Sequence, residues 1–401
     1  MERPLRVLLI TDWMPSPGGA EEHATLVRDG LKAAGDEVRM LTSSAGSAAA
    51  GAADFVAYGT EHPAAQTVLQ IVNPFAARAC RTAVRVFRPD VALVQLFAYH
   101  LSPAVLWPLT DVPTALLVVD YKIVCPLGSK LLPDGRICEQ RAGLVCWRSG
   151  CLSLPHWLRD EMRYAAIRPA VRRATSVLAC SRHVQQVLGA NGIESEHITL
   201  PVAPPSDGFV RRPADHPAFV FCGRLSVEKG VPLLIRAFAR LLSRSPHAQL
   251  KIVGDGPLRR QIEGDVASLG LKDTVTFTGW LDAEGVEREL ANAWALVAPS
   301  TWAEPFGLVV PEAIVRGVPV IASAAGGFAE TVVPEVSGLL FPSGDESALY
   351  DAMVRVADGE LFPWHRLPEA VVANARITFG IEGHIGRLRA ALQRIARRDG
   401  S

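Results

Sequence analysis

The sequence has no long run of apolar residues, although 49% of its 401 residues are hydrophobic. No segment approaches the roughly 18 consecutive apolar residues of a membrane-spanning helix. The first apolar segment ends at Asp12 and lacks the small-residue cleavage site of a secretory signal. The sequence therefore predicts a cytoplasmic protein of two or more domains, since a domain usually takes about 100–200 residues.

The chain also has no excess of charge of either sign. Its 41 Lys and Arg residues balance 41 Asp and Glu residues, which removes the attraction on which nucleic-acid binding depends. No Asp-x-Asp occurs, so nothing indicates a divalent ion that bridges a ligand and the protein. At an anion site the positive charge would come from side chains and helix N-termini. We expect no nucleic-acid partner and no catalytic cofactor.

Cysteines are too few, at seven, for a disulfide scaffold. Four of them nevertheless lie in one irregular segment, about 122–155, which is rich in Gly and Pro: Cys125, Cys138, Cys146 and Cys151. Four thiolates could hold a structural zinc ion tetrahedrally, although no C-x-x-C occurs here. Reduced thiols are one alternative, and one or two disulfides are another, which a reducing cytoplasm disfavours.

The sequence does contain a regular alternation of short apolar runs and amphipathic segments, which predicts strands and helices in turn. The predicted strands of the first half are Leu5–Thr11, Glu37–Thr42, Val91–Leu96, Thr114–Val119 and Ser176–Cys180. Those of the second half are Ala218–Gly223, Gln249–Gly254, Thr274–Gly279, Ala295–Pro299 and Val318–Ala322. Between the halves, residues 201–217 hold five prolines and read as a linker. This pattern predicts an α/β protein with two doubly wound domains.

We place the first domain at 1–205 and the second at 206–370. The remaining residues, 371–401, carry apolar side chains at near-helical spacing, which predicts one or two helices that pack back on the first domain. In such architectures a ligand binds by default in the cleft between the domains, at the carboxyl ends of the strands.

Two glycines, Gly18 and Gly19, follow the first predicted strand and open a helix. Their backbone amides and the helix N-terminus would suit a phosphate or sugar hydroxyls. A tight strand-to-helix turn without a ligand is an equally good interpretation of this short motif.

The second half contains basic residues at a strand end, in Gly223-Arg224-Leu225 and Glu228-Lys229-Gly230. The fork of donors on Arg224, the ammonium of Lys229 and a helix N-terminus would converge on a diphosphate. A solvated pair of cations is the alternative. Gly254, in a Gly-Asp-Gly-Pro turn after the next strand, would admit a flat ring or a backbone contact.

The segment from Glu304 to Glu312 has a carboxylate at each end. We expect Glu312 to accept hydroxyl groups from a ribose and Glu304 to hold those of a sugar. The backbone amides between them would face an anion at a helix start, and they belong to Phe306, Gly307 and Leu308.

Taken in order with a later Gly-Gly-x-x-Glu turn, these motifs resemble family 4 of the retaining nucleotide-sugar glycosyltransferases, from Val7 to about Leu388. The resemblance implies a GT-B fold, in which two Rossmann-like domains face each other across a cleft. It implies a nucleoside diphosphate sugar donor on the second domain and an acceptor hydroxyl on the first. It also implies that Arg224 and Lys229 bind the diphosphate, Glu312 the ribose and Glu304 the donor sugar.

The first domain departs from this pattern, because Val119-Asp120-Tyr121 stands where relatives carry His-Asp-Tyr. Retaining transfer does not require that histidine, since the leaving phosphate oxygen can take the acceptor proton while Arg224 and Lys229 stabilise the charge. Asp120 is the nearest substitute for an acceptor contact, and a structural cap is its alternative role. A catalytically silent subunit, or a phosphorylase or synthase of the same fold, are the alternative functions.

Two basic segments of the first half remain. One is predicted as a helix with no acid among its arginines, which are Arg78, Arg81, Arg85 and Arg88. The other, 157–173, carries five arginines together with Trp157 and Tyr164. Either could rest on anionic lipid at the inner membrane face. An ordinary solvated helix face is the alternative.

Overall fold

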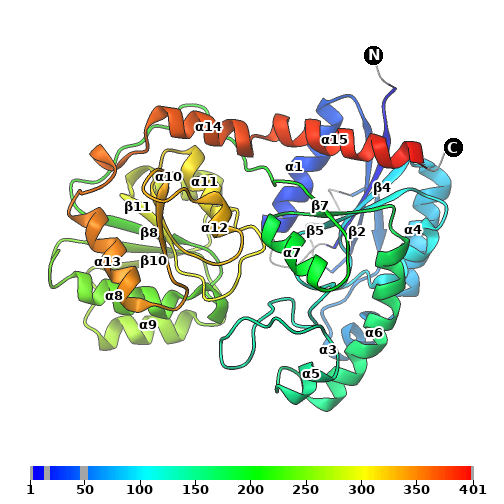
Figure 1. Cartoon of the computed structure of the whole chain (residues 1–401), viewed down its shortest axis with the longest axis horizontal. Coiled ribbons are helices and arrows are strands. Elements are labelled where there is room, and N and C mark those ends of the chain that lie inside the picture. Colours follow the sequence, from blue (N-terminus) through cyan, green and yellow to red (C-terminus); the bar gives the residue numbers. More distant parts are fainter. Residues whose placement is uncertain (1–2, 13–18, 46–52, 399–401) are drawn as a thin grey trace. The chain divides into compact units, whose positions relative to one another are not determined.

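The computed structural model describes residues 3–12, 19–45 and 53–398. The chain divides into two compact units, coloured blue to green with a red C-terminal helix and green to orange in Figure 1. Unit 1 comprises Met1–Pro201 and Ile381–Ser401, and unit 2 comprises Val202–Gly380. Each unit is a parallel sheet covered by helices. Within the described ranges, no helix is both long and apolar enough to cross a bilayer.

Unit 1 contains a seven-stranded sheet in the order β3-β2-β1-β4-β5-β6-β7. All of its strand pairs are parallel, and Val7 at the centre lies opposite Val38 on one side and Val91 on the other. The central strands are buried on both faces, as expected for parallel strands with helices on either side. The strands are β1 (Arg6–Thr11), β2 (Glu37–Ser43), β3 (Phe55–Ala57), β4 (Val91–Leu96), β5 (Thr114–Val118), β6 (Ser176–Ala179) and β7 (Glu196–His197).

The helices of unit 1 lie on both faces of this sheet. They are α1 (Gly19–Ala33), α3 (Pro63–Leu69), α4 (Pro74–Phe87), the short 3-10 helix η1 (Pro103–Leu109), α5 (Leu144–Arg148), α6 (Leu154–Arg173), α7 (Arg182–Ala190) and α15 (Ile381–Arg398). Right-handed crossovers place α1 on one face and α4, η1 and α6 on the other. The C-terminal α15 packs on α1, where a Cβ on Gly30 would lie 2.5 Å from Cγ1 of Ile385. The last helix therefore belongs to the core of unit 1.

Unit 2 contains a six-stranded parallel sheet in the order β10-β9-β8-β11-β12-β13. The strands are β8 (Ala218–Cys222), β9 (Gln249–Val253), β10 (Val275–Gly279), β11 (Ala295–Ala298), β12 (Val320–Ser323) and β13 (Gly338–Phe341). The helices are the 3-10 helix η2 (Val227–Lys229), α8 (Val231–Leu241), α9 (Arg259–Ser268), α10 (Ala283–Asn292), α11 (Val309–Val315), α12 (Phe328–Thr331), α13 (Glu346–Ala357), the 3-10 helix η3 (Pro363–His365) and α14 (Glu369–Phe379).

All ten strands predicted from the sequence are confirmed, within two residues at each end. Three strands were missed: β3, β7 and β13. β3 and β7 have only three and two residues, too few to show a pattern of burial, whereas β13, with four residues, is as long as β6, β11 and β12. The chain returns to unit 1 at Ile381 rather than at residue 371, because α14 packs on α11 within unit 2.

Candidate functional site

The loops that follow the strands of unit 2 are joined by backbone hydrogen bonds at the carboxyl edge of its sheet. The amide of Leu225, after β8, donates to the carbonyl of Asp255, after β9, at 2.9 Å. The amide of Thr301, after β11, donates to the carbonyl of Glu228 at 2.8 Å. The amide of Gly254 donates to the carbonyl of Gly279, at the end of β10, also at 2.8 Å. These hydrogen bonds hold the loops of the motifs together at the carboxyl edge of the sheet, and we call these joined loops the platform.

Two glycines of the motifs are required by the close approach of these loops. Gly230 has a φ of +69°, and a Cβ there would lie 2.0 Å from the carbonyl oxygen of Pro299. Gly326 has a φ of +61°, and a Cβ there would lie 2.2 Å from the carbonyl oxygen of Glu304. A larger residue at either position would push the loops apart, since only glycine combines this backbone conformation with such contact.

An ion pair lies at the centre of the platform. Nζ of Lys229 is 2.7 Å from Oε1 of Glu304, which also accepts a hydrogen bond from Oγ of Ser300 at 2.6 Å. Glu304 is only 3% exposed, and Nζ of Lys229 lies 5.6 Å from the ring centre of Trp302. The buried carboxylate of Glu304 thus has hydrogen-bond partners, and it holds the ammonium of Lys229 in place. Ser300 and Trp302 were missed from the sequence, although they lie between β11 and the predicted Glu304.

Arg224 lies at the same edge, directly after Gly223, and is exposed. Its guanidinium makes no hydrogen bond or ion pair to another residue that the structure describes. The five N–H donors of this side chain therefore remain available to a ligand. Together, Arg224 and Lys229 give the edge two cations, as the sequence predicted for an anion site.

Glu312 is half-buried on α11 and lies near the end of β8. Burial raises the pKa of the Cys222 thiol, and the nearby charge of Glu312 raises it further. The segment before α11 is fixed by its neighbours: Phe306 is buried against Phe379, and a Cβ on Gly307 would lie 2.1 Å from the ring of Phe328. The side chain of Phe306 is therefore a core anchor. Leu308 is half-buried and directly precedes α11.

In unit 1, Asp120 follows β5 and accepts hydrogen bonds at both carboxylate oxygens. The hydroxyl of Tyr99 donates at 2.8 Å and the backbone amide of Lys122 at 2.9 Å. Burial raises the pKa of Asp120. These are the contacts of a structural cap, and its role toward an acceptor stays a prediction. Gly18 lies outside the described residues, and Gly19 is the first residue of α1.

A second buried carboxylate of unit 1 was missed. Asp12, at the end of β1, accepts hydrogen bonds from the backbone amides of Tyr99, His100 and Leu101, each at 3.0 Å. Burial raises the pKa of Asp12 despite these bonds. Its only signal in the sequence is its position at the end of an apolar strand. It holds the loop after β4 against β1.

The expectation that Tyr164 lies on a lipid-facing surface of α6 is wrong. Tyr164 and Arg163 are almost completely buried, and Arg163 pairs with the buried Asp160 at 3.2 Å. The hydroxyl of Tyr164 donates to the carbonyl of Lys122 at 2.6 Å. Helical spacing alone did not reveal that this side of the helix faces the segment that follows β5.

All four cysteines of the irregular segment are free thiols. Burial raises the pKa values of Cys146 and Cys151, and the neighbouring thiols, Cys125 and Cys138 among them, raise them further. Among residues 3–12, 19–45 and 53–398, no group of three or more His, Cys, Asp or Glu side chains is arranged to hold a metal ion. A zinc ion would require these side chains to turn toward it, and zinc stays a prediction.

Two family models match the chain. The model described as "Glycosyl transferase 4-like domain" matches residues 18–203, and the model "Glycosyl transferases group 1" matches residues 207–377. Together they cover most of unit 1, without β1 and its C-terminal helix, and almost all of unit 2.

Curated relatives match over part of their length. An uncharacterized glycosyltransferase of Methanocaldococcus jannaschii is 34% identical over 163 residues, which are 40% of each chain. The 2-deoxystreptamine N-acetyl-D-glucosaminyltransferase of Streptomyces fradiae is 36% identical over 213 residues, 48% of this chain and 49% of that protein. The chain thus spans less than half the length of these two relatives.

Solved structures match over nearly the whole chain. Sucrose-phosphate synthase from Thermosynechococcus elongatus has a TM-score of 0.66 at 24% identity, covering 99% of this chain and 97% of that one. The Anabaena protein HepE in complex with UDP has a TM-score of 0.69 at 20% identity, covering 97% and 100%. At such identities the likeness shows the fold.

Proposed function

The chain belongs to the glycosyltransferases that combine a 4-like domain with a group 1 domain in a two-domain α/β GT-B fold, and from this premise we propose its reaction. It transfers a sugar from a nucleoside diphosphate sugar to an acceptor hydroxyl, with retention of the anomeric configuration and without a catalytic metal. Glycans, glycolipids and small molecules all carry hydroxyls of the kind it would use.

The observation that carries this proposal is the cationic carboxyl edge of unit 2. Arg224 is exposed there without a partner among the described residues, and Lys229 is held by Glu304 at 2.7 Å. A diphosphate carries negative charge on several oxygens, so a fork of guanidinium donors and one fixed ammonium match it well. A single phosphate or a carboxylate would use only part of this arrangement.

The positive charges of Arg224 and Lys229 also match the negative charge that develops during the proposed reaction. The bond between the sugar's anomeric carbon and the donor phosphate oxygen breaks, and negative charge develops on the diphosphate. Lys229 stabilises that charge without moving, because Glu304 and the joined loops already hold it, and Arg224 adds its guanidinium donors. The acceptor oxygen bonds to the same face of the anomeric carbon, and its proton passes to the departing phosphate oxygen. No protein base is needed for this step.

The remaining site residues take roles around the diphosphate. Glu304 holds sugar hydroxyls with its second carboxylate oxygen, while Oε1 keeps Lys229 and Ser300. Glu312, near the end of β8, accepts the ribose hydroxyls. The turn at Gly254 admits the nucleoside, and the amides of Gly307 and Leu308 face the donor.

Thermal shifts with a panel of nucleoside diphosphates test the proposal. A ligand at about 100 times its dissociation constant adds roughly 2.7 kcal/mol to the free energy of unfolding, and we expect one base to give the largest shift. Absence of any shift with all of them would contradict a nucleotide donor.

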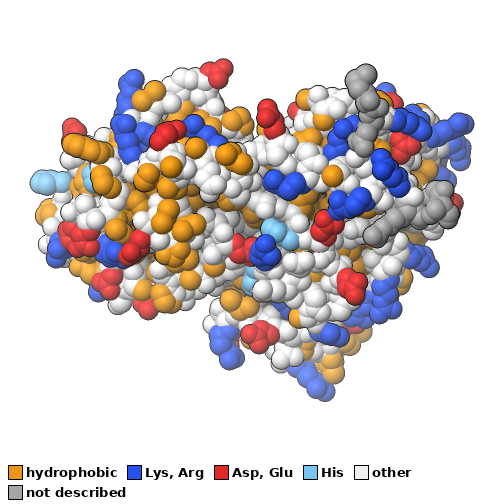
Figure 2. Space-filling model, turned by 45° about the horizontal axis from the view of Figure 1, so that its top comes forward, with side chains coloured by type: hydrophobic (Ala, Val, Ile, Leu, Met, Phe, Trp, Pro, Cys, Tyr) orange, Lys and Arg blue, Asp and Glu red, His pale blue; other side chains and the backbone are white. Residues whose placement is uncertain are grey.

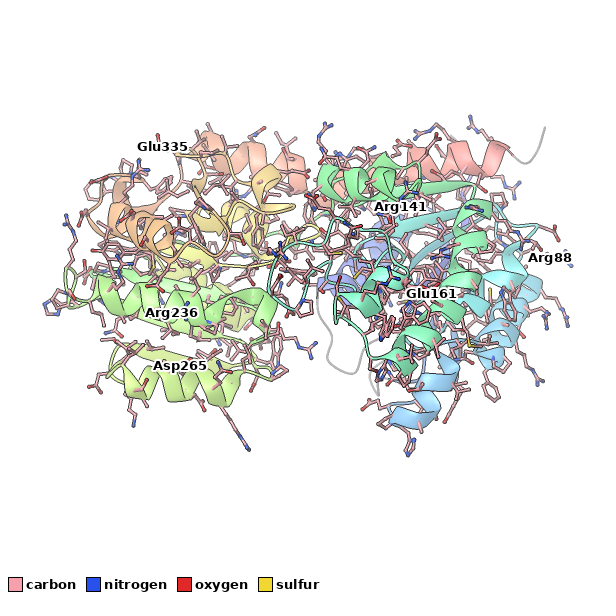
Figure 3. The ribbon with its side chains drawn as sticks, turned by 60° about the horizontal axis from the view of Figure 1, so that its bottom comes forward. Arg88, Arg141, Glu161, Arg236, Asp265 and Glu335 are labelled. Atoms are coloured by element: carbon pink, nitrogen blue, oxygen red, sulfur yellow. The ribbon has the colours of Figure 1, made fainter. Side chains whose placement is uncertain are left out.

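Titration calorimetry with the best nucleoside diphosphate then tests the ribose contact. Glu312→Gln should weaken binding about ten- to a hundredfold, because hydrogen bonds to a charged group contribute about 1.5–3 kcal/mol. Glu335→Gln is the matched control, since Glu335, labelled in Figure 3, is exposed and pairs with Arg355 on α13. Equal affinity of wild type and Glu312→Gln would make Glu312 a structural helix residue.

A further inference from the structure

Helix α4 of unit 1 presents a row of arginines to solvent. Arg78, Arg81 and Arg85 are exposed at helical spacing. None of the three has an ion pair or hydrogen bond to a side chain in the described part of the chain. The helix contains no acidic residue, so its outer face carries positive charge alone. Figure 2 shows Lys and Arg side chains along the lower right edge of unit 1.

The arginines of a comparable row on unit 2 are all paired with carboxylates. Arg236 and Arg240 lie on α8, which Figure 3 shows with Arg236 labelled, and Arg244 follows in the turn after the end of the helix. They lie 2.8, 3.6 and 2.6 Å from carboxylate oxygens, contributed by Glu346 to the first two and Asp358 to the third. The unpaired row on α4 is thus not the general state of surface arginines in this protein.

Apolar side chains are exposed beside that row. Leu154, Leu158 and Met162 form a stripe at every fourth position of α6, and they are 46%, 52% and 61% exposed. Between the two helices lies η1, which contacts both and exposes Trp107. All three elements cover the same face of the sheet. We name these seven residues the basic-apolar face: Arg78, Arg81, Arg85, Trp107, Leu154, Leu158 and Met162.

Few acids oppose this charge. Asp111 follows η1 and is exposed, and Glu161 lies on α6. Asp160 is buried and paired with Arg159 and Arg163. Acidic side chains are therefore a minority around the arginines.

A pocket of about 340 Å³ on the other side of α6 also combines basic and apolar side chains. Its wall includes the apolar side chains of Ile167 and Val171, and its lining includes three arginines and no carboxylate. The arginines are Arg141, Arg168 and Arg172.

We propose that the basic-apolar face docks on the surface of an anionic phospholipid bilayer. The arginines would meet lipid phosphates while the leucines, Met162 and Trp107 enter the boundary between head groups and acyl chains. Nucleic acid would satisfy the arginines and leave the apolar stripe in water. A neutral apolar partner would cover the stripe and leave the arginines unpaired. Only a surface that offers both chemistries matches the whole face. This proposal is independent of the transfer reaction.

Sedimentation with vesicles tests it on the full chain. One set of vesicles contains phosphatidylcholine alone, and the other contains equal amounts of phosphatidylcholine and phosphatidylglycerol. We expect binding to the second set at low ionic strength, with weaker binding as salt screens the charges. No binding to the anionic vesicles, or equal binding to both sets, would overturn the proposal.

Matched variants locate the contact. The triple variant Arg78→Gln, Arg81→Gln, Arg85→Gln should weaken binding to anionic vesicles roughly a hundredfold, since each basic residue near such a surface contributes about a factor of five. The control is Arg236→Gln, Arg240→Gln, Arg244→Gln, which removes the same charge from unit 2 and should bind as wild type does. Equal losses in both variants would mean that only net charge matters, which would overturn the assigned face.

The apolar stripe has its own pair of variants. Leu154→Ser, Leu158→Ser, Met162→Ser should reduce vesicle binding, whereas the control Leu269→Ser, Val333→Ser, Ile377→Ser changes exposed apolar residues of unit 2 and should not. Melting temperatures close to wild type verify that each variant folds. Unchanged binding of a folded α6 variant would contradict insertion of the stripe.

Discussion

Lys229 and Glu304, 75 positions apart in the sequence, form an ion pair with a distance of 2.7 Å between Nζ and Oε1. The sequence predicts that Lys229 binds a diphosphate and that Glu304 binds a sugar, and the structure shows that the two side chains contact each other. An ammonium has three donors, so Lys229 can keep this bond and still bind an anion. Glu304 therefore positions Lys229, and in the proposed reaction it also holds the donor sugar.

The first prediction concerns the two cations. Lys229→Ala and Arg224→Ala should each lower kcat/KM about ten- to a hundredfold, because each removes charge-assisted hydrogen bonds of about 1.5–3 kcal/mol to the leaving diphosphate. Steady-state kinetics with the donor measure this. Lys251→Ala is the control, since Lys251 pairs with Glu289 on α10, and it should leave turnover unchanged. Full activity of Arg224→Ala would remove that residue from the site.

The sequence was informative where local chemistry determines structure. Strands such as β1 and β4 are continuous apolar runs because helices cover both faces of a parallel sheet. The glycines at positions 230 and 326 stand in motifs that the sequence singled out, whereas the close contacts that require glycine there are seen only in the structure.

Other features depend on packing between distant segments. Arg163 and Tyr164 are buried because the segment after β5 covers α6, and no periodicity within α6 reports this. The pairing of Lys229 with Glu304, and the hydrogen bond from Ser300, follow from how the loops after β8 and β11 meet. Such pairs form only when the fold brings distant segments together, so the local sequence does not reveal them.

The second prediction concerns the irregular segment. Elemental analysis of protein purified without added metal should give about one zinc ion per chain, bound by Cys125, Cys138, Cys146 and Cys151. Replacing Cys146 by Ser should lower the content, whereas Cys80→Ser, at a buried thiol of α4, should not. Zinc should also leave as the pH falls, because thiolates bind the ion and protons compete. Fully active protein without zinc and with reactive thiols would assign this segment to free cysteines.

The third prediction follows from two buried histidines of unit 1. The rings of His23 and His384 are 5.5 Å apart, and Nδ1 of each lies within hydrogen-bonding distance of an oxygen, of Gln95 and Thr199 respectively. Burial lowers the pKa of His23 to about 4 and that of His384 to about 3. Both imidazoles are therefore neutral in the folded protein at neutral pH.

A neutral buried base is protonated first in the unfolded chain. Stability from these residues should be complete above about pH 6.5 and fall as the pH drops toward 4, with roughly 3 kcal/mol attributable to His23. Urea unfolding between pH 7 and pH 4 measures it. His23→Gln should reduce this dependence, and His247→Gln, at an exposed position of unit 2, should not. An identical pH dependence in the His23 variant would exclude this assignment.

The fourth prediction concerns Val119, which precedes Asp120 at the end of β5. General acid-base catalysis typically contributes 10²–10⁴-fold, so a missing catalytic imidazole would leave wild type nearly inert. We expect an active wild type, and a gain of less than about tenfold or a loss in Val119→His, because the phosphate oxygen takes the proton. Initial rates at several pH values compare the two proteins. An inert wild type with a large gain in Val119→His would favour the silent-subunit alternative.

The most direct test of the account is the release of nucleoside diphosphate from nucleotide sugars by the purified protein. Wild type should release it slowly by hydrolysis with one donor of a panel and faster when an acceptor is added, and the new glycosidic bond should keep the donor's anomeric configuration. Lys229→Ala should release about ten- to a hundredfold less. Wild type that releases no nucleoside diphosphate from any donor, with or without acceptors, would contradict the proposed transfer.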